Sequence, residues 1–262
     1  MQQIQLTGPS RQAMSLLVYG PPGAGKSTVL AQLAAAAEAD GRSVVLMDAE
    51  HGLVPAAISA GLRSAQLLDA SQRGAAGEVF QRCQQALREG HGLVGLDTVT
   101  EISRSILDDL ASDSGALKIQ AYGEQATRLG RVVRSLRDLT GTGTVAVASA
   151  QQDAQDIEGR PGKWHPAVRA KLVTDLVSQF DCVARLRQVA THEAEALALP
   201  AGTRYLDFRP TAQQVAKCRT AAELFAGRSS DWHVWPCRNQ ADMTALYGAL
   251  SRTKAADGEN ND

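Results

Sequence analysis

A glycine-rich segment near the start of the chain has the residue types and the spacing of a phosphate-binding loop. It runs Gly20-Pro21-Pro22-Gly23-Ala24-Gly25-Lys26-Ser27, and Thr28 follows it. Glycines let backbone N–H groups converge on phosphate oxygens, a lysine in this place reaches the β- and γ-phosphates, and the serine hydroxyl binds Mg²⁺. We predict that residues 20–28 bind ATP, that Lys26 takes part in catalysis and that Ser27 is a ligand of Mg²⁺.

Asp97 is the expected second ligand of Mg²⁺. It closes the apolar segment GLVGLD. A carboxylate at the carboxyl end of a strand lies at the edge of the sheet where a phosphate-binding loop opens, so it can hold the ligand shell of the metal. The alternative is an aspartate that caps the helix after the strand. The upstream phosphate-binding loop favours the metal-binding role.

Glu50 is the candidate for activating water, because hydrolysis needs a group that orients or deprotonates the attacking water. It follows another apolar segment, in Asp48-Ala49-Glu50-His51-Gly52. From this position alone, Asp48 and Glu50 are more often ordinary loop carboxylates.

Apolar segments alternate with helical patterns over most of the chain. Expected strands are residues 15–19, 43–47, 66–68, 92–96 and 144–148, and expected helices are residues 28–39, 77–89, 122–139 and 167–178. Such alternation predicts an α/β fold with a mostly parallel central sheet flanked by helices. Three strand-like stretches without helices between them (181–187, 203–209 and 213–219) predict an antiparallel C-terminal extension of the sheet.

The same patterns predict how the chain is divided. We expect an N-terminal segment at residues 1–14, an ATPase core at residues 15–220, and a C-terminal extension at residues 221–262 that ends in a disordered polar tail.

A polar stretch with Gly159, Pro161 and Gly162 is expected to form a loop between residues 153 and 166. The basic and aromatic residues in and after it are the candidates for binding single-stranded DNA: Arg160, Lys163, Trp164, Arg169 and Lys171. A cationic groove with a stacking side chain is what such binding requires. The alternative is a tryptophan that serves packing.

Composition narrows the partners and the location. The formal net charge is −1, so contact with a polyanion must come from a local patch. The four cysteines form no CxxC pair, and the sequence pattern predicts neither a signal peptide nor a long apolar membrane segment. We expect reduced thiols, a cytoplasmic location and no membrane contact. The spacing of Cys218, His233 and Cys237 fits no standard zinc pattern, so no structural metal is expected.

Several segments, in order along the chain, resemble the RecA-like P-loop ATPases. These are YGPPGAGKS, DAEHGL, LDTVT, TVAVASAQ, QFDCVARL and AKCR, and together they look most like the compact phage-type members, including the Sak-type single-strand annealing proteins. The resemblance implies that Glu50 is the catalytic glutamate and that Gln151 senses the γ-phosphate and relays to the DNA-binding loop. It also implies that Lys217 and Arg219 reach into the ATP site of a neighbouring subunit. The small residues around Ala56 stand where that family has an adenine-stacking aromatic, so no adenine contact is carried over.

We therefore expect a Mg²⁺-dependent ATPase, stimulated by single-stranded DNA, that acts in phage-type recombination or annealing. Expected partners are single-stranded DNA, further copies of the chain with ATP at their interfaces, and a single-strand-binding protein. Two alternatives stay open: an ATPase of the same superfamily that acts on a protein partner, as a helicase loader or a KaiC-like switch, and a P-loop kinase.

Overall fold

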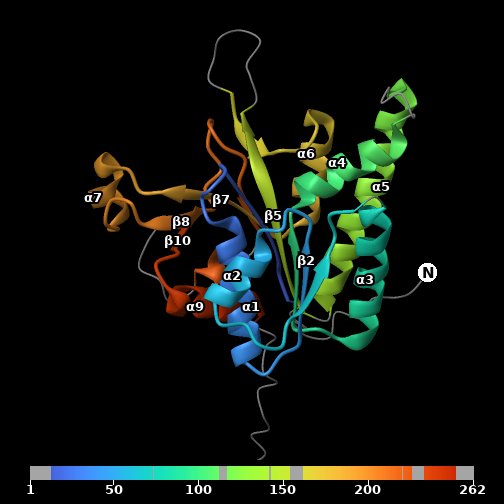
Figure 1. Ribbon diagram of the computed structural model, residues 1–262. Helices are drawn as coiled ribbons and strands as arrows, with labels where there is room; N and C mark the ends of the chain where they lie inside the picture. The colour runs from blue at the N-terminus through green and yellow to red at the C-terminus, as the bar shows by residue number, and fades with distance from the viewer. Residues whose placement is uncertain are drawn as a thin grey trace, which may run out of the picture.

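The computed structural model describes residues 13–72, 74–111, 117–141, 143–153, 162–219, 221–225 and 233–251. Within them, ten strands form one sheet, ordered β10-β8-β7-β1-β5-β4-β2-β3, with β6 paired to β5 and β9 paired to β7 (Figure 1). The predicted α/β fold with a mostly parallel sheet is confirmed.

The parallel part of the sheet is its centre. It comprises β1 (Ser15–Gly20), β2 (Val44–Asp48), β3 (Gln66–Asp69), β4 (Leu93–Asp97), β5 (Thr144–Asp153) and β7 (Cys182–Gln188). Every residue of β1, β2 and β4 is buried, because helices cover both faces of the sheet. Strands buried on both faces are read from the sequence as continuous apolar runs, which is why these three are predicted to within one residue.

The remaining strands pair antiparallel with their neighbours. β6 (Trp164–Pro166) pairs with β5, β8 (Arg204–Asp207) and β9 (Lys217–Cys218) pair with β7, and β10 (Val234–Pro236) pairs with β8. The predicted antiparallel extension is therefore confirmed.

Helices cover the two faces in separate groups (Figure 1). One group comprises α1 (Lys26–Ala39), α2 (Leu53–Ser59), α8 (Ala221–Leu224) and α9 (Gln240–Ser251), which contribute to one hydrophobic core cluster. The other comprises α3 (Ala75–Glu89), α4 (Val99–Leu110), α5 (Ile119–Asp138) and α6 (Ala170–Gln179), which build the second cluster. α9 packs against α1, and the N–H of Met14 donates to the carbonyl of Leu250 at 2.9 Å, so the described part of the C-terminal extension packs in the same core as α1.

The C-terminal strands depart from the prediction in two places. A 3₁₀ turn at Thr191–Glu193 and α7 (Ala194–Leu197) lie between β7 and β8, where no helix is expected. The stretch 213–219 contributes only the two residues of β9 to the sheet. Asp207 pairs with Arg185 and Lys217 with Val183, so residues 208–216 leave the ladder between these pairs.

Two residues of the stretch 208–216, Gln213 and Val215, form backbone hydrogen bonds with β6. The N–H of Trp164 donates to the carbonyl of Gln213 at 2.8 Å, and the N–H of Val215 donates to the carbonyl of Trp164 at 2.9 Å. β5 pairs with β6 and continues to Asp153, five residues beyond the predicted end of β5. The loop predicted at residues 153–166 thus ends in a strand, and residues 154–161 lie outside the described part.

No helix in the described ranges is long and apolar enough to cross a membrane.

Candidate functional site

The predicted phosphate-binding loop connects β1 to α1 at the carboxyl edge of the sheet. Its first residue, Gly20, is aligned with Ala150 of β5. Its last glycine, Gly25, precedes α1 with φ 98° and ψ 29°, a left-handed conformation that favours glycine. No described side chain caps this helix end. The first N–H groups of α1 are therefore available to an anion, as phosphate binding requires.

The side chain of Lys26 contacts the first residues of this loop. Its Nζ donates to the carbonyls of Gly20 and Pro21, each at 3.2 Å, and the residue is only 9% exposed. Burial lowers the pKa of Lys26, while the negative charges of Glu50 and Asp97 raise it. The ammonium group thus lies near Glu50, the predicted catalytic carboxylate, and Asp97, the predicted ligand of Mg²⁺.

Ser27 and Asp97 are in direct contact. The Ser27 hydroxyl donates to Oδ2 of Asp97 at 2.5 Å, while Oδ1 of Asp97 is buried without a hydrogen-bond partner among the described residues. Burial raises the pKa of Asp97 to about 6; the bond from Ser27 opposes this rise, and the charge of Glu50 adds to it. A buried carboxylate oxygen without a partner, beside a serine hydroxyl, fits the oxygen ligands that Mg²⁺ prefers. The capping alternative fails, because Thr98 and not Asp97 caps α4.

Gly52 lies close to the side chains of Ser27 and Asp97. A Cβ atom at Gly52 would lie 3.1 Å from Oγ of Ser27 and 3.7 Å from Oδ2 of Asp97. A larger residue would crowd the predicted metal ligands.

Glu50 is held by Thr98, the residue that follows β4 and caps α4. The Thr98 hydroxyl donates to Oε1 of Glu50 at 2.9 Å. Asp48, which is aligned with Asp97 across β2 and β4, accepts the N–H of Glu50 at 3.1 Å and that of Leu53 at 2.9 Å. Asp48 thus fixes the turn into α2, and the exposed carboxylate of Glu50 remains open toward solvent. This arrangement could orient a water molecule.

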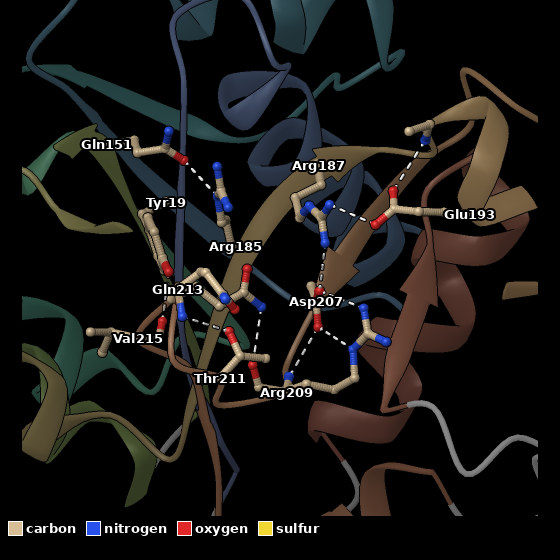
Figure 2. A network of polar contacts seen from close by, with 12 residues as sticks. Tyr19, Gln151, Arg185, Arg187, Glu193, Asp207, Arg209, Thr211, Gln213 and Val215 are labelled. Carbon is tan, nitrogen blue, oxygen red and sulfur yellow. Dashed lines mark hydrogen bonds and ion pairs between the residues drawn. The ribbon is translucent and has the colours of Figure 1, made fainter. Parts of the chain in front are cut away.

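Gln151 belongs to a chain of contacts that leads away from the loop (Figure 2). It follows Ala150 on β5, and its Oε1 accepts a hydrogen bond from Nε of Arg185 at 2.8 Å. The guanidinium of Arg185 stacks on the ring of Trp164 with 4.7 Å between Cζ and the ring centroid. The Tyr19 hydroxyl donates to the carbonyl of Val215 at 2.7 Å (Figure 2). It also lies 3.1 Å from the carbonyl of Trp164. Gln151 is therefore connected to Trp164 of β6 through the side chain of Arg185.

Lys217 and Arg219 lie near the amino end of β7. The phosphate-binding loop of the same chain lies at the other edge of the sheet, where the parallel strands have their carboxyl ends. Nζ of Lys217 donates to the carbonyls of Val177, Ser178 and Phe180 at 2.6–3.1 Å. Arg219 donates to the carbonyl of Ser178 at 2.8 Å. Burial lowers the pKa of Lys217, and the charge of Arg219 adds to this. In the isolated chain both cations bind the carboxyl end of α6, and a role in a neighbouring site stays a prediction.

The candidate DNA-binding residues are only partly free. Lys163, Arg169 and Lys171 are all exposed. The guanidinium of Arg169 also lies over the ring of Tyr122, 4.1 Å from its centroid. One face of Trp164 is occupied by Arg185, as described above. Arg160 lies outside the described residues. The packing role of Trp164 is thus observed, and DNA contact stays a prediction.

Sequence reasoning misses three residues that organise the site: Thr98, Gly52 and Arg185. Arg185 carries the one available signal, since a charged residue stands inside the otherwise apolar start of β7 (CVARL). The contact of Thr98 with Glu50 leaves no signal in the sequence, because it depends on the alignment of β2 with β4.

Comparison with known proteins agrees with this architecture. Residues 12–220 match a protein family described as an AAA domain. The solved structure of an ATPase domain of another protein is similar, with a TM-score of 0.52 and 12% identity over 89% of this chain and 84% of that chain. At that identity the likeness concerns the fold, and it supports the predicted RecA-like P-loop architecture.

Proposed function

The chain belongs to the AAA domain family, and on that premise we propose that it is a Mg²⁺-dependent ATPase that acts on single-stranded DNA. The observation that carries the ATPase role is the contact between Ser27 and Asp97 beside Lys26, with one buried oxygen of Asp97 left without a partner among the described residues. Phosphoryl transfer depends on positioned cations and an oriented nucleophile. Lys26 and the proposed metal ligands Ser27 and Asp97 would supply the first, and Glu50 the second.

Each residue has a defined task in the proposed reaction. The loop N–H groups and Lys26 bind the phosphates, and Lys26 offsets the negative charge that develops on the leaving phosphate. Ser27 and Asp97 would hold Mg²⁺, which when bound neutralises phosphate charge. Glu50, fixed by Thr98, orients the attacking water and accepts its proton.

The DNA part of the proposal rests on the contacts of Gln151. A change in the position of Gln151 would be passed through Arg185 to Trp164 on β6, next to the exposed Lys163. In this proposal Gln151 responds to the γ-phosphate, and β6 adjusts the DNA-binding segment. The resemblance to phage-type annealing proteins supports a role in recombination or annealing, with a single-strand-binding protein as a further partner.

We further propose that the active form is a homo-oligomer. Lys217 and Arg219 lie far from their own loop, as positive groups that serve a neighbour must. They would contact ATP across the interface and offset charge in the transition state.

The test of the DNA role is steady-state ATP turnover with and without saturating single-stranded DNA at low salt. We expect stimulation that declines as salt is added, because phosphate contacts are screened and counterions compete. Turnover that DNA leaves unchanged would reject the DNA role and favour the protein-partner alternative. Size measured in parallel, with and without a non-hydrolysable ATP analogue, tests the oligomer.

A further inference from the structure

Arg204 begins β8 and lies on the same side of the sheet as α1. It is aligned with Gln188, at the carboxyl end of β7. Alternate residues of a strand face the same side, and Leu206, two residues on, packs in the hydrophobic cluster beneath α1. The side chain of Arg204 therefore leaves the sheet at the edge where the phosphate-binding loop opens, on the side of that loop.

The guanidinium of Arg204 stands against the loop itself. A Cβ atom built on Gly25 would lie 2.9 Å from Nη1 and 3.3 Å from Cζ of Arg204. Gly25 is the residue before Lys26 and the N-cap of α1. The charged group thus reaches the point where the first N–H groups of the helix are exposed.

No described residue pairs with this guanidinium through a hydrogen bond or an ion pair. The other arginines nearby differ: Arg187 pairs with Glu193 and Asp207, and Arg209 pairs with Asp207 (Figure 2). An arginine has five N–H donors, and Arg204 is only partly exposed. The start of α1, which no described side chain caps, lies beside the guanidinium. Such a cluster of donors and positive charge favours an anion.

We propose that Arg204 is a further nucleotide-binding residue, which donates hydrogen bonds to the α- and β-phosphates of ATP bound in its own subunit. This inference rests on the proposed function. The backbone of such a loop cradles the α- and β-phosphates, and the lysine reaches the β- and γ-phosphates. Because the guanidinium of Arg204 lies beside Gly25, where the loop backbone meets the start of α1, we expect it to serve the phosphates that ATP and ADP share. It acts within one chain, unlike the predicted role of Lys217 and Arg219.

The test is the affinity of wild type and Arg204→Gln for ATP, ADP and inorganic tripolyphosphate, each measured by displacement of a fluorescent ADP analogue. We expect all three affinities to fall together, by about ten- to a hundredfold, because a charge-assisted hydrogen bond is lost. Arg82→Gln removes an arginine from the exposed face of α3 and should bind like wild type.

Three results would overturn the inference. Wild-type affinities in Arg204→Gln would show that the residue does not contact the nucleotide. Loss of ATP affinity alone would assign it to the γ-phosphate, and unchanged tripolyphosphate affinity would assign it to the base or ribose. If the wild type bound no nucleotide, the proposed function would fail first. Arg204→Lys keeps the positive charge but lacks the planar guanidinium, and it replaces Arg204→Gln in the test if that variant does not fold. A loss of ATP and ADP affinity in Arg204→Lys would then support the inference, and unchanged affinity would overturn it.

Discussion

The hydroxyl of Thr98 donates a hydrogen bond of 2.9 Å to Oε1 of Glu50. The same Thr98 oxygen accepts the N–H of Glu101 at 3.3 Å and so caps α4. Thr98 follows Asp97 directly, so one peptide unit joins the predicted metal ligand to the group that holds the predicted general base. The orientation of Glu50 therefore depends on the start of α4.

Removal of this hydroxyl should slow turnover without weakening ATP binding. In Thr98→Val, Glu50 loses its fixed orientation, and we expect kcat to fall by about tenfold while KM changes little. Loss of the helix cap should lower the free energy of unfolding by about 1 kcal/mol. Steady-state kinetics and thermal unfolding measure the two effects. Thr98→Ser keeps both hydrogen bonds and is the matched control; a kcat in Thr98→Val equal to that of the serine variant would contradict the role of Thr98.

The raised pKa of Asp97 predicts a dependence on pH. Mg²⁺ binds the ionised carboxylate, and the pKa of about 6 means that Asp97 takes up a proton as pH falls through this value. The Mg²⁺ concentration needed for half-maximal turnover should therefore rise below about pH 6, by up to tenfold per pH unit. Turnover measured over a Mg²⁺ series at about pH 5.5, 6.5 and 7.5 checks this. An identical Mg²⁺ requirement at the three values would count against Asp97 as the ligand.

In the absence of metal, the raised pKa of Asp97 makes the folded state less stable at higher pH. The folded state holds its proton more tightly than the unfolded state, in which the pKa is near 3.8, so Asp97 opposes folding increasingly as pH rises through about 6. In EDTA at about pH 8, Asp97→Asn should raise the free energy of unfolding by about 3 kcal/mol. This gain should disappear below about pH 4, where both states are protonated. Chemical unfolding at both pH values measures it, and a loss of stability at the higher pH would contradict the prediction.

Crowding at Gly52 should affect the metal site alone. The added methyl group of Gly52→Ala lies 3.1 Å from Oγ of Ser27, so the hydroxyl must move. We expect a weaker apparent affinity for Mg²⁺, by about tenfold, with little change in fold. Gly123→Ala is the control, since a Cβ atom there meets no atom within 4 Å. The prediction fails if both alanine variants show the same Mg²⁺ dependence.

The contact of Arg185 with Trp164 should matter for coupling to DNA more than for hydrolysis itself. Trp164→Leu removes the ring that Arg185 stacks on, and we expect basal turnover to persist while stimulation by single-stranded DNA falls by about fivefold or more. Trp164→Phe retains a ring face and should keep most of the stimulation. Equal stimulation in the leucine and phenylalanine variants would argue against this route of coupling.

The proposed contact between subunits can be tested by mixing two inactive variants. Lys217→Ala retains Glu50, and Glu50→Ala retains Lys217, so a mixed interface can unite both intact groups. We expect partial recovery of turnover when the proteins are mixed before assembly. If co-assembled subunits, verified by size, show no recovery, Lys217 does not act on a neighbouring site.

The central fold could be predicted because its signals are local. β1, β2 and β4 are buried on both faces, and their apolar runs end at glycine or carboxylate residues that form the site. The glycine-rich loop, Asp97 and Glu50 can be found in this way, since each follows or closes the end of a strand. In a parallel sheet those ends lie at one edge, so their proximity follows from topology.

The C-terminal part could not be predicted with the same precision, because its arrangement depends on distant partners. Residues 208–216 leave the ladder, and their backbone bonds to Trp164 on β6 and to His233 before β10 join segments that are distant in the sequence. Lys217 binds carbonyls at the end of α6, some forty residues earlier in the chain. The contacts of Thr98 and Arg204 likewise depend on how strands are aligned, which spacing along the sequence does not reveal.

The most direct test of the ATPase site is the rate of phosphate release from ATP by the wild type, Lys26→Ala and Glu50→Gln, each with Mg²⁺ and with EDTA. We predict Mg²⁺-dependent turnover in the wild type and background rates in both variants. Glu50→Gln should still bind ATP, since its carboxylate orients water and does not hold the phosphates. Turnover that persists in Lys26→Ala, or that EDTA leaves unchanged, would contradict the assignment of residues 20–28, Glu50 and Asp97 as a Mg²⁺-dependent ATPase site.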